Sequence, residues 1–107
     1  MLDTLTEASF TPHIGTEFRI EIDAATTILA VLVDVTVRHR GRVLAPWDSN
    51  PEPRREPFSI VFRGPLDPPL LQRMYRVEHE AIGVVKDLFL VPVGVNQDGR
   101  FYEAVFN

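Results

Sequence analysis

The 107-residue chain contains no cysteine, so it can form neither a disulfide framework nor a thiolate metal site. It also lacks closely spaced histidines: His13, His39 and His79 are its only three, and no two stand at the i, i+4 spacing of a zinc-protease helix. A metal site would have to assemble from distant strands. We therefore expect no tightly bound zinc or iron and no cofactor, and we interpret His13 and His79 as bonded to backbone at turns.

Long apolar runs are missing as well. The stretch 28–37 is interrupted by Asp34 and followed by Arg38, His39 and Arg40, which leaves it well short of the roughly 20 apolar residues that a membrane helix requires. The start of the chain has no basic region followed by an apolar segment, so it does not resemble a secretory signal. We expect a cytoplasmic protein without a membrane partner, with export by a route that needs no such signal as the alternative.

A surplus of positive charge is also absent, because the net charge is −4. Residues 1–37 carry six acidic residues against Arg19, and the five arginines of 38–57 share that segment with three acids and four prolines. Proteins that bind nucleic acid usually concentrate positive charge on one face. We therefore expect no nucleic-acid partner.

Catalytic motifs are missing from the sequence. Ser9, Ser49 and Ser59 lie outside a Gly-x-Ser-x-Gly context, and the glycines are too isolated to cradle a phosphate. The carboxylates are scattered, as is typical of the wet face of an antiparallel sheet. These absences favour a non-enzymatic protein. Folding can bring catalytic groups together from anywhere in a chain, so a hydrolase with an unrecognised site remains an alternative.

What the sequence does contain is strand-like alternation. Apolar and polar residues alternate with the period of two that half-buried strands show. This pattern predicts strands over 18–22, 28–37, 58–62, 75–79, 84–93 and 102–106. Thr4-Leu5-Thr6-Glu7 has the spacing of a capping box, which predicts a short helix ending before Pro12. We therefore predict one all-β domain over residues 1–107, an antiparallel barrel or sandwich of about six strands with a short N-terminal helix.

The same alternation predicts which side chains are buried. Residues 28–37 should form a long strand whose first half is buried on both faces. Pro92 should mark an edge or a bulge, because proline cannot donate to a ladder, and residues 96–99 should form a hairpin turn. The predicted core consists of the residues in the apolar phase of their strands: Phe18, Ile20, Phe58, Ile60, Phe62, Val77, Phe89, Val91 and Phe106.

Segment 38–57 is the first candidate surface for a partner, because Trp and Arg are common in interface hot spots. This segment connects two predicted strands and is longer than most loops in compact domains. Alternatively, Trp47 covers an open end of the core and the prolines stiffen a solvated loop. The residues expected to contact a partner here are Trp47, Arg40, Arg42, Arg54 and Arg55.

The proline-rich connection 65–71 is the second candidate surface. Its three prolines restrict the unfolded chain and can pin a crossover between two strands without any ligand, which is the first interpretation. The second interpretation is an exposed apolar strip in which Leu66 and Leu70 contact a partner.

Several stretches carry a resemblance to a known family. They are Phe62-Arg63-Gly64-Pro65, residues 72–79, 88–94 and 102–107, and the opening residues 2–6 and 12–15. Together they resemble a family of small bacterial proteins classed as a domain of unknown function, number 6916. The resemblance covers nearly the whole chain except 39–57. It assigns no catalytic residues, and it implies an accessory role in a bacterial or phage-tail-like assembly.

We therefore expect a structural or protein-interaction module that binds a protein partner or associates with itself. The main alternative is a β-barrel that binds a small molecule or carbohydrate, with Trp47 and Tyr75 as stacking platforms. A filled barrel with an exposed apolar strip would favour the first function, and a sizeable pocket with converging carboxylates or Trp47 would favour binding of a ligand or hydrolysis.

Overall fold

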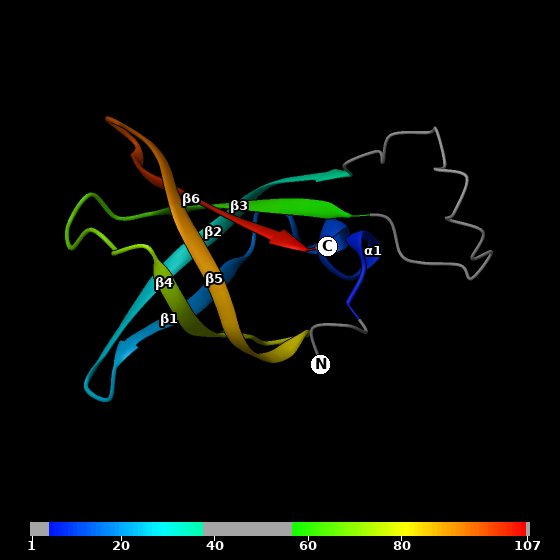
Figure 1. Ribbon diagram of the computed structural model, residues 1–107, viewed down its shortest axis with the longest axis horizontal. Helices are drawn as coiled ribbons and strands as arrows, with labels where there is room; N and C mark the ends of the chain where they lie inside the picture. Colours follow the sequence, from blue (N-terminus) through cyan, green and yellow to red (C-terminus); the bar gives the residue numbers. More distant parts are fainter. Residues whose placement is uncertain (1–4, 38–56, 107) are drawn as a thin grey trace, which may run out of the picture.

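The computed structural model describes residues 5–37 and 57–106, and its strands close into a barrel (Figure 1). Neighbouring strands are antiparallel throughout, in the order β1-β2-β3-β6-β5-β4. The predicted all-β antiparallel fold is confirmed, and the architecture is a barrel instead of a sandwich. Its strands are β1 (Glu17–Asp23), β2 (Thr26–Val37), β3 (Phe58–Gly64), β4 (Arg73–His79), β5 (Gly83–Asn96) and β6 (Gly99–Phe106).

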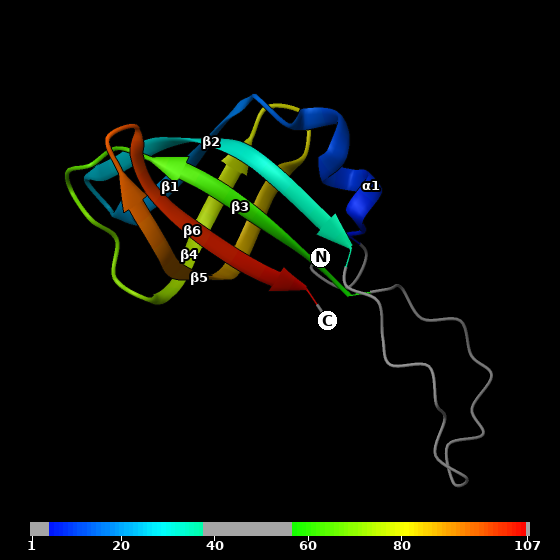
Figure 2. The same cartoon turned by 90° about the horizontal axis from the view of Figure 1, so that it is seen from above.

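The barrel is built from two three-stranded meanders, β1 to β3 and β4 to β6, although the sequence has no repeat. Equivalent strands of the two meanders pair with each other, β1 with β4 and β3 with β6. The strand order is therefore the same whether it is read from β1 or from β4. As a result β2 and β5, the long middle strands, lie on opposite sides of the barrel (Figure 2).

The predicted N-terminal helix is present, but its cap differs from the prediction. Helix α1 (Glu7–Phe10) ends before Pro12, as expected, and a 3-10 turn, η2 (Thr11–His13), follows it. The N-cap is Thr6, in extended conformation, and its backbone N–H donates to Ser9 Oγ at 3.0 Å. The expected cap, Thr4, lies outside the described residues, and Glu7 is the first residue of the helix instead of its third. Neither helical segment is long and apolar enough to cross a membrane.

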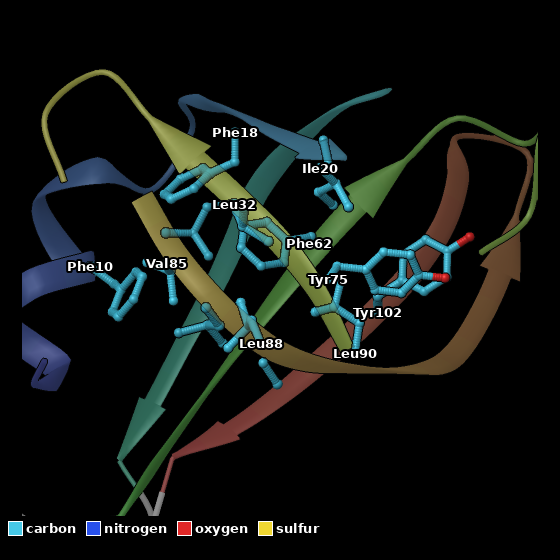
Figure 3. Packing of buried hydrophobic residues seen from close by; sticks show 14 of the residues in the cluster. Phe10, Phe18, Ile20, Leu32, Phe62, Tyr75, Val85, Leu88, Leu90 and Tyr102 are labelled. Carbon is cyan, nitrogen blue, oxygen red and sulfur yellow. The ribbon is translucent and has the colours of Figure 1, made fainter. Parts of the chain in front are cut away.

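Hydrophobic side chains from α1 and every strand fill the barrel (Figure 3). Phe10 closes one end, where its ring lies 5.4 Å from the ring of Phe106, and Tyr75 and Tyr102 lie together at the other end. No buried side-chain nitrogen or oxygen within residues 5–37 and 57–106 lacks a hydrogen-bond partner. Burial is confirmed for seven predicted core residues: Phe18, Ile20, Phe58, Ile60, Phe62, Val77 and Phe106.

The predicted burial of Phe89 and Val91 is wrong. Phe89 is 43% exposed and Val91 is only partly buried, whereas Leu88 and Leu90 point into the core. The cause is a β-bulge: Val85 pairs with Val77, but the next paired residue of β5 is Leu88, opposite Tyr75. One extra residue in β5 moves the side chains that follow it, as far as the next bulge, to the opposite face. Asp87, in the bulge, has a left-handed φ of 58°.

The predicted two-sided burial of the first half of β2 is also wrong. Ile28, Ala30 and Leu32 are buried, but Leu29 is 52% exposed. A closed barrel buries only one face of each strand unless something else covers the outside. A bulge between Leu32 and Asp34 then changes the phase, and Val35 packs against the core.

The two irregularities predicted for this part of the chain, a bulge at Pro92 and a hairpin turn over residues 96–99, are confirmed. A register shift falls between Pro92 and Gly94, so Pro92 borders a bulge. Asn96 pairs with Gly99 across the predicted hairpin turn, and Asn96 Oδ1 accepts a hydrogen bond from the Asp98 N–H at 2.8 Å.

Candidate functional site

The two predicted partner surfaces fare differently. Trp47, Arg40, Arg42, Arg54 and Arg55 lie outside the described residues. Leu66 is 46% exposed, in agreement with the expected apolar strip. Leu70 is only 3% exposed and belongs to the core, so it is not available to a partner.

Hydrogen bonds from the barrel hold the proline-rich connection in place. Tyr102 Oη accepts a hydrogen bond from the Leu70 N–H at 2.9 Å, and Tyr75 Oη donates to the Leu71 carbonyl at 2.7 Å. Arg100 Nε donates to the Leu66 carbonyl at 2.6 Å. These contacts satisfy backbone groups of a segment whose prolines cannot donate. They support the structural interpretation of this connection.

Tyr75 is not a stacking platform for a carbohydrate. Its ring is buried in the core, its hydroxyl is bonded to Leu71, and the guanidinium of Arg73 lies 4.9 Å from the ring centroid. A platform for a sugar must present an open ring face, which Tyr75 does not.

An apolar surface lies on the outside of β4 and β5. Met74 is 59% exposed, and it is the direct cross-strand partner of Phe89. Val91 and Val93 continue the series along β5, and Val93 is 52% exposed. We call Met74, Phe89, Val91 and Val93 the β5 face. The outside of an antiparallel strand is usually polar, so three apolar residues in succession on the outside of β5, with Met74 of β4 beside them, are unusual.

The β5 face was not predicted, because the sequence places Phe89 and Val91 in the apolar phase of their strand. One signal could have indicated it. Residues 88–95 are apolar in both phases, a pattern that is typical of a strand covered on both sides. The barrel covers only the side that carries Leu88 and Leu90.

A second cluster surrounds His79 at one end of the barrel. His79 Nδ1 accepts hydrogen bonds from the Ala81 and Ile82 N–H groups at 3.0 and 3.2 Å. Its other nitrogen, Nε2, lies 2.9 Å from Thr16 Oγ1, and the Thr16 hydroxyl donates to the His13 carbonyl at 2.6 Å. His79 Nδ1 is an acceptor, and the Thr16 hydroxyl already donates its hydrogen to the His13 carbonyl, so Nε2 must donate to Thr16 Oγ1. His79 is therefore neutral, with its proton on Nε2. The interpretation of His79 as bonded to backbone at a turn is confirmed.

The surroundings of His79 oppose its protonation. Removal of the imidazole from water lowers the pKa of His79, and so do the nearby His13, whose ring centroid is 4.8 Å away, and Arg19, with Glu80 opposing them. A proton on Nδ1 would also face two backbone N–H groups. His79 is therefore unsuited to act as a general base, since its free lone pair is already used.

The cluster borders a hollow of about 370 Å³. A metal bound to His79 would have to displace Thr16 from Nε2 and leave the Nδ1 proton against two amides. Among the described residues, no three histidine or acidic side chains gather in a way that could hold a metal ion. The hollow is lined by His13, Thr16, Glu17, Arg19, Leu29, His79, Glu80 and Ala81.

Comparison with known proteins identifies the family. The model of the Domain of unknown function (DUF6916) matches residues 5–106, nearly the entire chain. The chain therefore belongs to the DUF6916 family. Neither the curated proteins nor the solved structures contain a match.

Proposed function

We propose that this member of the DUF6916 family is a non-enzymatic interaction module that docks a protein on its β5 face. The observation that carries the proposal is a mismatch between sequence and burial. The stretch 88–95 is apolar in both phases, but the barrel covers only one of them. Met74 and Phe89 stay exposed side by side on two adjacent strands.

The filled interior supports the same function. Aromatic and aliphatic side chains occupy the space in which a ligand-binding barrel would hold its ligand. Contiguous exposed apolar residues on a soluble protein usually mark a contact with another protein. An accessory subunit of a bacterial or phage-tail-like assembly would use such a surface.

Phe89→Glu tests this function, with Gln97→Glu in the exposed β5–β6 turn as a matched control that adds the same charge elsewhere. Both variants should keep the thermal midpoint of the wild type, because both positions are open to solvent. Immobilised wild type and Gln97→Glu should retain the same proteins from an extract of the native host, including further copies of the chain. Phe89→Glu should lose them, since a charge would be buried in the contact.

If folded Phe89→Glu retains every protein that the wild type retains, the β5 face is not a docking surface. Mass spectrometry of the retained proteins gives the comparison.

A second candidate function is the binding of a small polar molecule in the hollow beside His79. Its volume falls within the range of small-ligand pockets, and Glu17, Arg19 and Glu80 supply charges of both signs. Ligand screening by thermal shift tests this candidate. A compound that stabilises the wild type but not Glu17→Gln would support it, and the absence of any such compound would leave the hollow without this function.

A further inference from the structure

The turn between β4 and β5 is held by the side chain at its first position. His79 pairs with Gly83 across the turn, which leaves Glu80, Ala81 and Ile82 between the two strands. The N–H groups of Ala81 and Ile82 both donate to His79 Nδ1, at 3.0 and 3.2 Å. One lone pair on one ring nitrogen therefore accepts two hydrogen bonds of this turn.

Two other turns of the barrel are held in the same way but by a different acceptor. Between β1 and β2 the Ala25 N–H donates to Asp23 Oδ1 at 2.8 Å, and between β5 and β6 the Asp98 N–H donates to Asn96 Oδ1 at 2.8 Å. An amide oxygen stays an acceptor near neutral pH, and a carboxylate does so until the pH falls to about 4. The lone pair of His79 Nδ1 is lost when the imidazole takes up a proton, which ordinarily happens near pH 6.5. The β4–β5 turn thus has an acceptor that can be removed by mild acid.

The other ring nitrogen of His79 is not affected by this change. Nε2 lies 2.9 Å from Thr16 Oγ1 and carries a hydrogen in the neutral and in the charged ring, so it can donate to Thr16 in both states. A second proton must therefore bind Nδ1, where it would point at the N–H groups of Ala81 and Ile82. Protonation breaks the hydrogen bonds on the turn side of the ring and leaves the one on the Thr16 side intact.

The surroundings of His79 make a positive charge costly while the turn is closed. Burial lowers the pKa of His79 most, the neighbouring His13 and Arg19 lower it as well, and Glu80 raises it. The hollow beside the ring gives a charged imidazole a route to water once the turn releases it. The titratable and charged groups that surround the ring come from η2, β1 and the turn, and they are His13, Glu17, Arg19 and Glu80.

The segment that can open with the turn is short. Ile82 is half-buried and packs against the core, and Val84 is 41% exposed. Val85 is buried, and so is Val77, its cross-strand partner on β4. Local opening takes place where few buried contacts oppose it, so an opening that begins at residues 80–82 should stop at Val85.

We propose that the β4–β5 turn is a pH-sensitive latch, in which a proton from solvent on His79 Nδ1 releases the N–H groups of Ala81 and Ile82 and lets residues 80–84 open while the rest of the barrel stays closed. Glu80 and Ala81 form part of the wall of the hollow, so opening of the latch changes the shape of the hollow with pH. Ile82 loses its contact with the core in the open state. The latch is independent of the docking role proposed for the β5 face.

Hydrogen exchange of individual backbone amides, followed by NMR between about pH 5 and 8, tests the latch. The measured quantity is the protection factor, which corrects for the intrinsic effect of pH on exchange. The protection factors of Ala81 and Ile82 should fall by up to about tenfold for each pH unit below 6.5, because opening takes up one proton. The Asp98 N–H, which is bonded to Asn96, should keep its protection factor, and the amides of β3 and β6 should stay protected.

Two variants identify the group that titrates. His79→Asn should remove the pH dependence, because its side-chain oxygen does not titrate and can accept the Ala81 N–H as Asn96 accepts that of Asp98. His13→Gln should shift the loss of protection to higher pH, since His13 lowers the pKa of His79.

Three outcomes would overturn the latch. They are constant protection of Ala81 and Ile82 in the wild type at every pH, the same decline in folded His79→Asn as in the wild type, and loss of protection in all strands at one pH, which would indicate global unfolding. Should His79→Asn fail to fold, the wild type and His13→Gln still decide the question, because a loss of protection at the same pH in both would show that the His13–His79 pair does not control the turn.

Discussion

Replacing Tyr102 with phenylalanine removes one oxygen atom from the barrel and leaves the volume of the ring unchanged. That oxygen accepts the hydrogen bond from the Leu70 N–H at 2.9 Å, in a buried environment where Tyr102 is 1% exposed. A buried donor left without a partner costs about 1–3 kcal/mol in the free energy of unfolding. For a domain of this size, each kcal/mol lowers the thermal midpoint by roughly 4–8 °C.

Tyr75→Phe is the matched control, because its hydroxyl bonds the Leu71 carbonyl beside an exposed side chain. Water can replace that hydrogen bond, so the free energy of unfolding should fall by less, about 0.5–1.5 kcal/mol. Urea unfolding followed by circular dichroism measures both variants. A loss of stability for Tyr102→Phe equal to or smaller than that for Tyr75→Phe would show that the core hydroxyl does not anchor the proline-rich connection.

Three further predictions use the same unfolding assay. Leu90→Ala should lower the free energy of unfolding by about 2–5 kcal/mol, because Leu90 is fully buried. Phe89→Ala should lower it by less than about 1 kcal/mol, because Phe89 is exposed. A larger loss for Phe89→Ala than for Leu90→Ala would place the β5 bulge elsewhere. Gly99→Ala should cost about 2 kcal/mol or more, because a methyl group there would collide with the Gly64 carbonyl oxygen at a left-handed φ of 153°; an unchanged stability would contradict this. The pKa of His79 is lowered in the folded protein, so as the pH falls below the ordinary histidine pKa of 6.5 the unfolded chain takes up this proton before the folded protein does. The contribution of His79 to the free energy of unfolding should therefore be fully present above that pH and decline below it. His79→Gln should flatten the decline below about pH 6.5, and equal slopes of stability against pH in the two proteins would show that His79 does not cause it.

The strands could be predicted from the sequence because each carries a local signal. Phe18 and Ile20, or Ile60 and Phe62, alternate with polar residues, and a side-chain period of two is sufficient to place them inside. Closure into a barrel depends on the pairing of β1 with β4, which joins residues more than fifty positions apart. No local pattern encodes that pairing.

The errors in β5 have a specific physical origin. A bulge needs one residue in an unusual backbone conformation, and at this bulge that residue is Asp87, which has no glycine-like signal. A shift of one residue exchanges the inner and outer faces of the strand as far as the next bulge, so Leu90 takes the inner position that the alternation assigns to Phe89. The same shift conceals the β5 face, because the alternation places two of its residues, Phe89 and Val91, in the core.

The histidine cluster was predicted only in part. The sequence predicts that His79 bonds backbone at a turn, and it does. The approach of His13 and Thr16 depends on where η2 and the start of β1 lie relative to the β4–β5 turn, a tertiary arrangement with no signature in the sequence.

The pairing of Val37 with Phe58 at the ends of β2 and β3 has a consequence for how this protein can change. In the other half of the barrel, the equivalent strands β5 and β6 are joined through only Gln97 and Asp98. The strand pair is therefore already complete at Val37 and Phe58, and closing a loop costs little more as the loop lengthens. This junction is a natural insertion point, where evolution or an engineer can exchange one segment for another, or graft a foreign peptide, while the barrel keeps its register.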